Sequence, residues 1–360
     1  MKKRAIVIGD SFNNTLGLIR SLGQADVYVL LILVGDDRLF VNKSRYAKSV
    51  IQVNSLDDCH MILDKLRDEY CGATIICSND KAAKWVDDHE KVLSSNFRTP
   101  MRGKSLNAIF DKFQQCTLAL EFGITIPQSF LYKREDELPS NIKFPLLIKP
   151  VNSNNGSKSD IHICHELNQL ISALAISSEC NDFICQEFIN KEFEINMIGI
   201  ATDFGVYIPG GIKKIRHYPT IYSPCSFGQF LPTEALGINP EPIKAMISSI
   251  GYRGPFSVEF LRNSGKSYFM EVNFRHDGLA YAATAAGVNL MEYLFTQAPG
   301  KIDVRPTYMM DISTDYCHVT DGNISKKSWI KDFLKTKCQL NFNWRDPMPT
   351  IDYYRSKFLR

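Results

Sequence analysis

The first hundred residues alternate short apolar runs with amphipathic stretches, and this alternation constrains the fold more than any other feature of the 360-residue chain. Residues 4–9, 26–34 and 73–77 have the apolar composition of buried strands. Residues 14–22 and 56–70 repeat their apolar side chains at helical spacing. Strands that alternate with helices predict a parallel sheet that is covered by helices on both faces.

The pattern changes after residue 100. Residues 103–122 carry the apolar stripe of a helix, which Gly123 and Pro127 end. Residues 144–273 are mostly strand-like with interspersed helices, which predicts an α+β core. The tail, residues 306–360, is partly amphipathic and rich in aromatic side chains.

Charge and composition exclude several classes of protein. The 42 basic and 39 acidic residues nearly cancel, and no basic block with interleaved aromatics points to a nucleic acid partner. The longest apolar run, residues 27–34, is too short to cross a bilayer, and residues 5–8 are too short for a signal-peptide core. We therefore expect a soluble cytoplasmic protein with no membrane partner. The ten scattered cysteines, without a Cys-x-x-Cys pair, predict reduced thiols.

A predicted hairpin over residues 256–275 carries the most informative polar side chains. If the hairpin is centred on Gly265, Glu259 lies opposite Glu271, about 4.5–5.5 Å away at the β-carbon. Two such carboxylates repel each other unless a cation lies between them. Asn273 adds an oxygen on the same face, and ligation by oxygen alone suits magnesium. The alternative is an exposed face with ordinary surface glutamates.

Basic side chains accompany this predicted metal site. Arg275 continues the face of the hairpin. Lys149 ends an apolar strand, where its charge is costly unless it meets an anion, and Pro150 fixes its extended conformation. The polar loop 152–159, with Gly156, follows directly and could offer backbone N–H groups to phosphates. The loop alone also fits an ordinary turn.

The segment 183–189 predicts a buried strand whose edge could bind an adenine, with Glu187 accepting from the exocyclic amine. Glu194, in the next strand-like segment, could accept hydrogen bonds from ribose hydroxyls. A solvated edge for Glu187 and a salt bridge for Glu194 are equally acceptable interpretations.

Taken together, these motifs resemble the ATP-grasp superfamily of carboxylate ligases, over roughly residues 6–294. The resemblance implies a Rossmann-like pre-ATP-grasp domain (1–100), a small lobe with its linking helix (101–190), a large lobe (191–305) and a C-terminal extension (306–360). The sequence Arg275-His-Asp-Gly278 looks like a subgroup near the D-aspartate ligases, and a carbamoyl-phosphate-synthase-like subgroup is the alternative.

The resemblance also implies roles for individual residues. Glu259, Glu271 and Asn273 match the metal ligands, and Arg275 and Lys149 match the catalytic cations. The residues that match the nucleotide site are Lys112, Lys149, Gly156, Ser157, Gln186, Glu187, Phe188, Ile189, Glu194, Lys213 and Arg216. Which of Lys213, Lys214 and Arg216 contacts phosphate stays open.

The implied reaction uses ATP with two Mg²⁺ ions, for which Mn²⁺ is an alternative. The substrate carboxylate attacks the γ-phosphate, and an amine then displaces phosphate from the acylphosphate. The expected partners are small carboxylates and amines, and the family suggests a homodimer. Three alternatives stay open: an acylphosphate-forming ligase with another acceptor, a thiol acceptor, and a catalytically silent ATP-binding module.

Overall fold

The computed structural model describes residues 3–35, 40–106, 111–151, 161–176, 181–298 and 302–358. The chain divides into two compact units. Unit 1 comprises Met1–Leu106, Glu194–Val258 and Val272–Arg360, and unit 2 comprises Asn107–Phe193 and Glu259–Glu271. Among the described residues, no helix has both the length and the apolar character that crossing a membrane requires.

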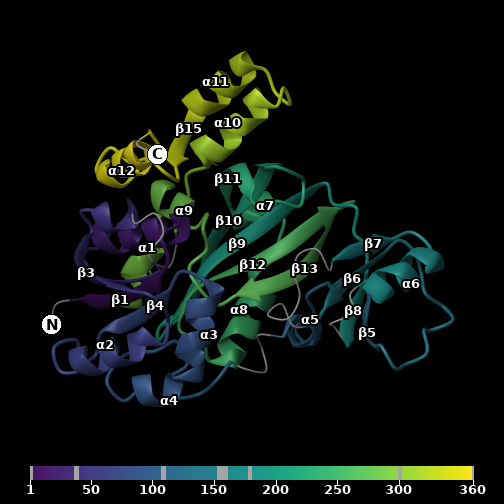
Figure 1. Cartoon of the computed structure of the whole chain (residues 1–360), viewed down its shortest axis with the longest axis horizontal. Coiled ribbons are helices and arrows are strands. Elements are labelled where there is room, and N and C mark those ends of the chain that lie inside the picture. Colours follow the sequence, from purple (N-terminus) through teal and green to yellow (C-terminus); the bar gives the residue numbers. More distant parts are fainter. Residues whose placement is uncertain are drawn as a thin grey trace. The chain divides into compact units, whose positions relative to one another are not determined.

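Unit 1 begins with a four-stranded parallel sheet, as the alternating sequence predicts (Figure 1). Its strand order is β3 (Ala47–Val53), β2 (Tyr28–Val34), β1 (Arg4–Gly9), β4 (Thr74–Cys77). The accompanying helices are α1 (Asn13–Gln24), α2 (Asp58–Leu66), α3 (Asp80–Asp88) and α4 (Glu90–Leu93), with the short 3₁₀ helix η1 (Phe40–Lys43).

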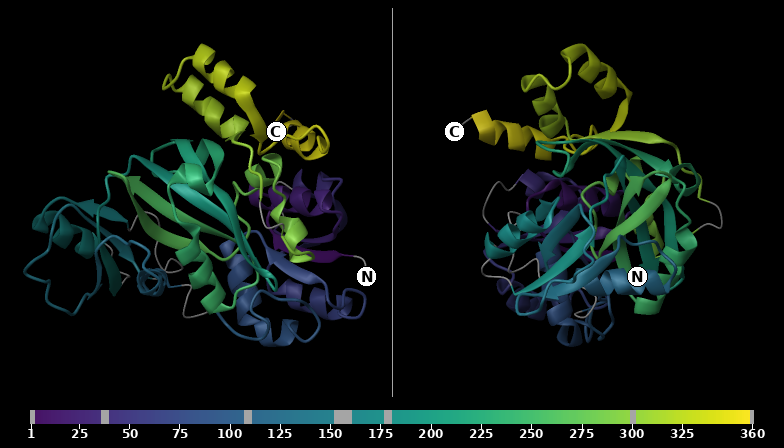
Figure 2. Two further views of the ribbon diagram at one scale, coloured as in Figure 1. Left: turned by 180° about the vertical axis from the view of Figure 1, so that it is seen from behind. Right: turned by 90° about the vertical axis from the view of Figure 1, so that its right-hand side faces the viewer.

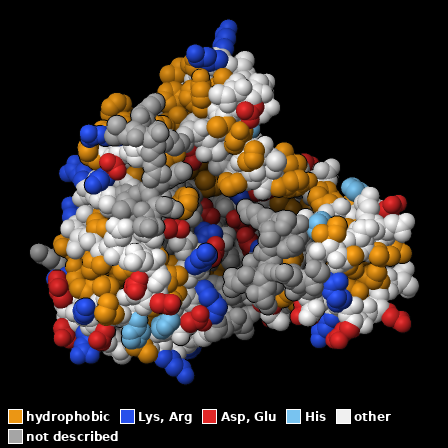
Figure 3. All heavy atoms as spheres, viewed as in Figure 1, with side chains coloured by type: hydrophobic (Ala, Val, Ile, Leu, Met, Phe, Trp, Pro, Cys, Tyr) orange, Lys and Arg blue, Asp and Glu red, His pale blue; other side chains and the backbone are white. Residues whose placement is uncertain are grey.

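Successive side chains of β1 enter different cores, because side chains alternate across a sheet. Val7 packs in one core with Leu16 of α1, whereas Ile8 packs in another with Leu63 of α2 and Trp85 of α3. Both faces of the sheet are therefore covered, which confirms the α/β prediction for this region. The face drawn in Figure 3 shows acidic and basic side chains interspersed over the helices of this sheet.

A seven-stranded sheet follows, with the order β13-β12-β9-β10-β11-β14-β15. Its strands are β9 (Phe193–Thr202), β10 (Gly205–His217), β11 (Cys225–Pro232), β12 (Gly254–Asn263), β13 (Lys266–Asn273), β14 (Thr307–Met310) and β15 (Thr336–Gln339). Its central pairs are antiparallel, and β14 and β15 run parallel. The helices in this part are α7 (Thr233–Leu236), α8 (Pro240–Ile250), α9 (Tyr281–Ala285) and η3 (Leu290–Leu294).

The C-terminal residues belong to unit 1. They add β14 and β15 to the large sheet and form α10 (Ile312–Thr320), α11 (Lys326–Lys335) and α12 (Met348–Phe358). Helix α12 contacts η1 and lies beside the N-terminal sheet in both views of Figure 2. Arg20 of α1 and Asp346 form an ion pair that is fully buried, with 3.0 Å between Nε and Oδ2.

Unit 2 contains an antiparallel sheet with the order β5-β8-β6-β7. The strands are β5 (Ser129–Lys133), β8 (Asp182–Glu187), β6 (Leu146–Pro150) and β7 (His162–Cys164), and the helices are α5 (Lys112–Glu121) and α6 (Leu167–Ile176). Leu146 and Ile148 pack with Leu170 of α6 in one core. The antiparallel sheets of this region agree with the predicted α+β core.

Two sequence expectations need correction. The helix expected over residues 103–122 begins only at Lys112, because Asp111 caps it by accepting from the backbone N–H groups of Phe113 and Gln114 at 2.6 and 3.2 Å. Strand β3 was not expected at all. Its alternating exposure is that of a half-covered edge strand, which gives a weaker apolar signal than the buried strands beside it.

Candidate functional site

The hairpin β12–β13 turns at Ser264 and Gly265, which link the two strands directly. Both have positive φ angles, of 47° and 77°, which is the signature of a two-residue type I′ turn. The turn is therefore centred between these residues and not on Gly265 as the sequence suggested. A regular hairpin with this turn would place Glu259 opposite Met270.

The hairpin is not regular, however. The rings of Phe260 and Phe269 pack edge to face with centroids 6.1 Å apart, and Asn273 Nδ2 donates to Ser257 Oγ at 3.3 Å. In a regular strand, side chains alternate between the two faces of the sheet. Ser257, three residues before Phe260, would therefore lie on the face opposite Phe260, whereas Asn273, four residues after Phe269, would lie on the same face as Phe269. One extra residue in β13 at positions 270–272, a β-bulge, would account for both contacts. Such a bulge would also allow a register with Glu259 opposite Glu271.

Within unit 2, Glu271 forms an ion pair with Lys112. Lys112 Nζ lies 2.8 Å from Glu271 Oε2, and both side chains are about one third exposed (33% and 28%). Lys112 is the first residue of α5, directly after the capping residue Asp111. A predicted metal ligand and a predicted phosphate-binding lysine, 159 positions apart in the sequence, thus meet in one unit.

Lys149 lies close to this pair. It is almost fully buried, and its Nζ donates to Gln186 Oε1 at 3.4 Å. The pairing of β6 with β8 puts Lys149 and Gln186 on the same face of the small sheet. Burial lowers the pKa of Lys149, the Lys112 ammonium lowers it further, and Glu271 opposes both effects. The ammonium groups of Lys112 and Lys149 and the carboxylate of Glu271 therefore lie close together in unit 2. An additional anion there would reduce the repulsion between the two lysines.

The predicted adenine-binding segment lies at the end of β8. Glu187 pairs with Leu146 in the sheet, so its side chain is on the face opposite Gln186. Its Oε2 accepts from Gln128 N at 3.3 Å, and its own N–H donates to Gln128 O at 2.7 Å. Phe188 and Ile189 continue the chain beyond β8. The predicted loop residues Gly156 and Ser157 lie outside the described residues.

Within unit 1, Asn273 belongs to a buried chain of hydrogen bonds. Its Nδ2 donates to Ser257 Oγ at 3.3 Å, and Ser257 Oγ donates to Asp277 Oδ2 at 3.0 Å. Asp277 also accepts from Asn196 Nδ2 at 3.2 Å and from Leu279 N at 2.8 Å. All four polar side chains of this group are less than a tenth exposed. The amide of Asn273 is therefore held from one end.

Arg275 lies at the other end of that amide. Its Nη2 donates to Asn273 Oδ1 at 3.1 Å, and its Nε and Nη2 donate to Asp80 at 2.8 and 3.1 Å. Asp80 begins α3, just beyond the C-terminal end of β4. Asp10, beyond the C-terminal end of β1, has a pKa raised by burial, which the hydrogen bond from Asn79 and the charge of Arg275 partly offset. Ligands of open α/β sheets bind at such strand ends.

The predicted ribose-binding residue Glu194 forms an ion pair with Lys214, at 2.8 Å between Oε2 and Nζ. Lys213, the neighbouring residue along β10, points to the other face by strand alternation. Arg216 is held by the C-terminal helices: it donates to both oxygens of Asp315 at 3.0 and 2.7 Å, and it also pairs with Asp332 at 2.5 Å. Its guanidinium stacks 4.2 Å above the Phe227 ring.

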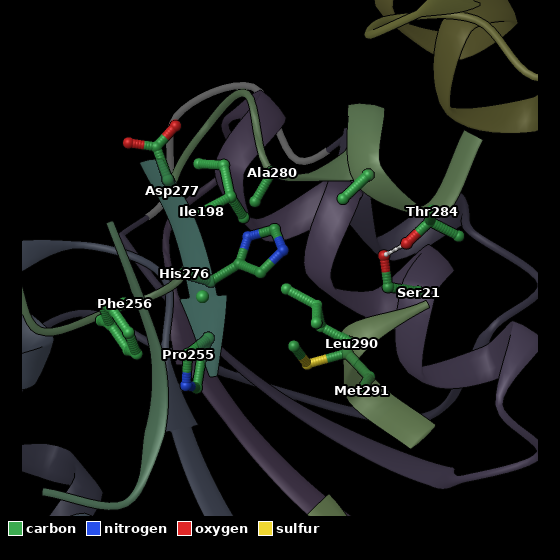
Figure 4. A pocket seen from close by; sticks show the side chains of 12 residues that line it. Ser21, Ile198, Pro255, Phe256, His276, Asp277, Ala280, Thr284, Leu290 and Met291 are labelled. Carbon is green, nitrogen blue, oxygen red and sulfur yellow. Dashed lines mark hydrogen bonds between the residues drawn. The ribbon is translucent and has the colours of Figure 1, made fainter. Parts of the chain in front are cut away.

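His276 is one of the residues that line a small cavity, and all of these residues belong to unit 1 (Figure 4). In Figure 4 its ring points into the space between Ile198, Ala280 and Leu290. Within the described part of the chain its Nδ1 has no hydrogen-bond partner. Burial lowers the pKa of His276 to about 4. The ring is therefore neutral at physiological pH and serves packing rather than charge.

The predicted site residues thus form two groups, one in each unit. Lys112, Lys149, Gln186 and Glu271 meet in unit 2, and Asn273 and Arg275 meet in unit 1. Sequence reasoning missed Ser257, Asp277 and Asp80. Ser257 could have been found, because it lies two positions before Glu259 in the same strand. Within the described residues, no three His, Cys, Asp or Glu side chains gather as a metal site.

No protein-family model matches the chain. It is 28% identical over 144 residues to a formate-dependent phosphoribosylglycinamide formyltransferase of Sulfurovum sp. (strain NBC37-1), which covers 38% of this chain and 36% of the relative. It is 25% identical over 142 residues to a D-alanine–D-alanine ligase of Pelagibacter ubique (strain HTCC1062), with 38% and 45% covered. The chain therefore spans less than half the length of these curated relatives.

Solved structures resemble the chain over a larger part. N5-carboxyaminoimidazole synthetase from Staphylococcus aureus has a TM-score of 0.68 at 14% identity, covering 89% of this chain and 86% of that one. L-amino acid ligase from Bacillus licheniformis has a TM-score of 0.61 at 15% identity, covering 84% and 76%. The parallel N-terminal sheet followed by antiparallel sheets agrees with the ATP-grasp fold. The fold and the partial sequence matches support the ATP-grasp superfamily, and they do not resolve a subgroup.

Proposed function

We propose that this protein is an ATP- and Mg²⁺-dependent ligase that activates a carboxylate as an acylphosphate and joins it to an amine, releasing ADP and phosphate. The observation that carries the proposal is the meeting of Lys112, Lys149 and Glu271 in unit 2, with 2.8 Å between Lys112 Nζ and Glu271 Oε2. A buried lysine and a partly exposed lysine beside a partly exposed carboxylate suit a triphosphate that carries a divalent cation.

The proposed metal ligands are Glu259, Glu271 and Asn273. They supply oxygen atoms only, which suits Mg²⁺ when phosphate oxygens and water complete the shell. Two of these side chains already contact a cationic group through an oxygen atom. Glu271 forms an ion pair with Lys112, and Asn273 Oδ1 accepts a hydrogen bond from Arg275. The residues present therefore fit the ion. We propose that β13 contains a bulge before Glu271, because Glu271 then shares a face with Glu259 and Asn273. When bound, Mg²⁺ would neutralise charge on the phosphate oxygens.

The proposed nucleotide contacts follow from the same arrangement. Lys149 and Lys112 neutralise phosphate charge, and Gln186 keeps the Lys149 ammonium in place through the 3.4 Å contact. We assign adenine binding to the backbone of residues 187–189, because the Glu187 side chain lies on the other face. Glu194 is the proposed ribose acceptor. The loop residues Gly156 and Ser157 remain proposed phosphate contacts from the sequence.

Among the basic residues of β10, we assign the phosphate or substrate contact to Lys213 or Lys214. Arg216 already forms ion pairs with Asp315 and Asp332. It would have to break both ion pairs to bind a phosphate. Arg275 is the proposed cation beside the transferring phosphoryl group. Loss of one such donor typically costs about 2.7–4 kcal/mol of transition-state stabilisation.

The test is ADP release, measured for pairs of carboxylates and amines. The panel contains formate, D-alanine and L-amino acids, which the names of similar proteins suggest as first carboxylates, together with aspartate and bicarbonate. Ammonia, amino acids and larger amines serve as acceptors. ADP release that depends on both a carboxylate and an amine supports the proposal, and the Glu271→Gln variant is the matched control for turnover at this site.

The other outcomes identify the alternatives. Release that needs coenzyme A in place of an amine indicates a thiol acceptor. Release with bicarbonate and ammonia indicates carbamoyl phosphate chemistry. ATP binding without turnover on any pair indicates a nucleotide-binding module and contradicts the proposed ligase.

A further inference from the structure

We infer that Ser257 and Asp277 are positioning residues that fix which end of the Asn273 amide faces the metal. The inference rests on the proposed function, since it takes Asn273 as a ligand of the nucleotide-bound cation. An asparagine amide has an oxygen at one end and an NH₂ group at the other, and only the oxygen can bind a cation. A ligand asparagine therefore needs a neighbour that selects its orientation.

The selection starts at Asp277. Its carboxylate is surrounded by the donors Asn196 Nδ2, Ser257 Oγ and Leu279 N, at 2.8–3.2 Å, and Arg275 Nη1 lies 4.0 Å away. An ionised carboxylate can only accept hydrogen bonds. The single proton of the Ser257 hydroxyl must therefore point to Asp277.

The constraint then passes to Asn273. Because the Ser257 proton is used, Ser257 Oγ can only accept from the amide that lies 3.3 Å away. The end of Asn273 near Ser257 must be Nδ2, and Oδ1 must point to the other side. There Oδ1 accepts from Arg275 Nη2 at 3.1 Å, a second donor that agrees with the same orientation. Ser257, Asn273 and Asp277 are 0%, 7% and 6% exposed, so water cannot easily replace any of these partners.

Two variants break the chain of hydrogen bonds in different ways. Ser257→Ala removes the acceptor, so the Asn273 amide loses its preference at that end. Asp277→Asn replaces a carboxylate, which only accepts hydrogen bonds, with an amide, which can also donate them. Its NH₂ group can donate to Ser257, whose proton then turns to Asn273 and favours the orientation with NH₂ toward the metal. The expected order of metal affinity is therefore wild type, then Ser257→Ala, then Asp277→Asn.

The control background is the Asn273→Asp variant. A carboxylate has an oxygen at both ends, so its orientation needs no selection. If Ser257 acts through the orientation of Asn273, Ser257→Ala should weaken metal binding in the wild-type background and have little effect in the Asn273→Asp background. A residue that merely supports packing would give the same loss in both backgrounds.

The experiment measures Mn²⁺ binding to the full chain in the presence of ADP, by electron paramagnetic resonance, so that no turnover is needed. Thermal unfolding and metal-free ADP binding show that each variant is folded. We expect about a 10-fold loss of Mn²⁺ affinity for Ser257→Ala and up to about 100-fold for Asp277→Asn, the range typical of residues that support a metal ligand. Within the Asn273→Asp background, Ser257→Ala should change the affinity less than about two-fold, on the same reasoning.

The outcomes separate this inference from the proposed function. A wild-type protein that binds no Mn²⁺ with ADP contradicts the metal site itself. If the wild type binds Mn²⁺ but Ser257→Ala and Asp277→Asn bind it equally well, the positioning role is wrong while the site stands. Equal losses from Ser257→Ala in the wild-type and Asn273→Asp backgrounds also overturn the positioning role, because Ser257 would then act through packing.

Discussion

The buried ion pair between Arg20 and Asp346 predicts that the C-terminal residues are essential to the stability of unit 1. Asp346 Oδ2 accepts from Arg20 Nε at 3.0 Å and from Ser44 Oγ at 2.8 Å, and Oδ1 accepts from Arg45 N at 2.9 Å. Arg20 also donates to the backbone oxygens of Leu340 and Asp346, each at 3.1 Å. The side chains of Arg20 and Asp346 are 0% and 1% exposed.

Asp346→Ala leaves the Arg20 guanidinium buried without a counter-charge. Removing one partner of a buried pair typically costs about 3–5 kcal/mol, and the Ser44 hydroxyl and Arg45 N–H lose their acceptor as well. We expect a loss of about 4–5 kcal/mol in the free energy of unfolding of unit 1, a large part of the roughly 5–15 kcal/mol that a domain has. Urea unfolding followed by circular dichroism measures it.

Two controls make the result interpretable. The double variant Arg20→Met with Asp346→Leu removes both charges and should recover most of the loss, because apolar replacements of a buried pair are often neutral. Asp88→Ala breaks the exposed pair with Lys84, whose side chains are 37% and 44% exposed, and should cost less than about 1 kcal/mol. If Asp346→Ala unfolds at the same urea concentration as the wild type, the reasoning from burial is refuted.

Two further predictions concern the site, and a third concerns His276. Glu271→Gln should fold normally, bind ATP weakly and lose ADP release; unchanged turnover would remove the metal assignment. Lys149→Met should be as stable as the wild type or more stable in urea, because it removes a buried charge whose pKa burial lowers, yet bind ATP at least about ten-fold more weakly; equal nucleotide affinity by calorimetry would contradict its phosphate role. Burial lowers the pKa of His276 from 6.5 to about 4. Between these two pH values, His276 is therefore protonated in the unfolded chain but not in the folded chain. Above about pH 6.5 His276 should not reduce the free energy of unfolding, which should fall by on the order of 3 kcal/mol as the pH drops to about 4. His276→Leu should lose this part of the pH dependence. Urea midpoints that are identical for the wild type and His276→Leu across that range would count against the prediction.

Local patterns in the sequence are sufficient to predict several elements of the fold. The apolar runs of β1, β2 and β4 and the helices between them specify a parallel sheet, because each side chain's burial follows from its own position in the repeat. The spacing of Glu271, Asn273 and Arg275 in one short segment likewise required no tertiary information. Lys112 was matched in the same way, and the residue before it, Asp111, proved to be a helix cap.

The contacts between residues that are distant in the sequence depend on the folded chain. Asn273 donates to Ser257, a contact that the regular register of the two-residue turn does not allow, and turn residues alone cannot reveal such an irregularity beyond the turn. Arg216 forms an ion pair with Asp315, 99 positions away. Ser257 of β12 donates to Asp277, which follows the end of β13. Such partners are chosen by the packing of strands and helices, since a single polar residue in the sequence carries no signal of the oxygen or nitrogen that it will face. For that reason the sequence could indicate a metal ligand in Asn273, whereas the folded chain was needed to show what orients it.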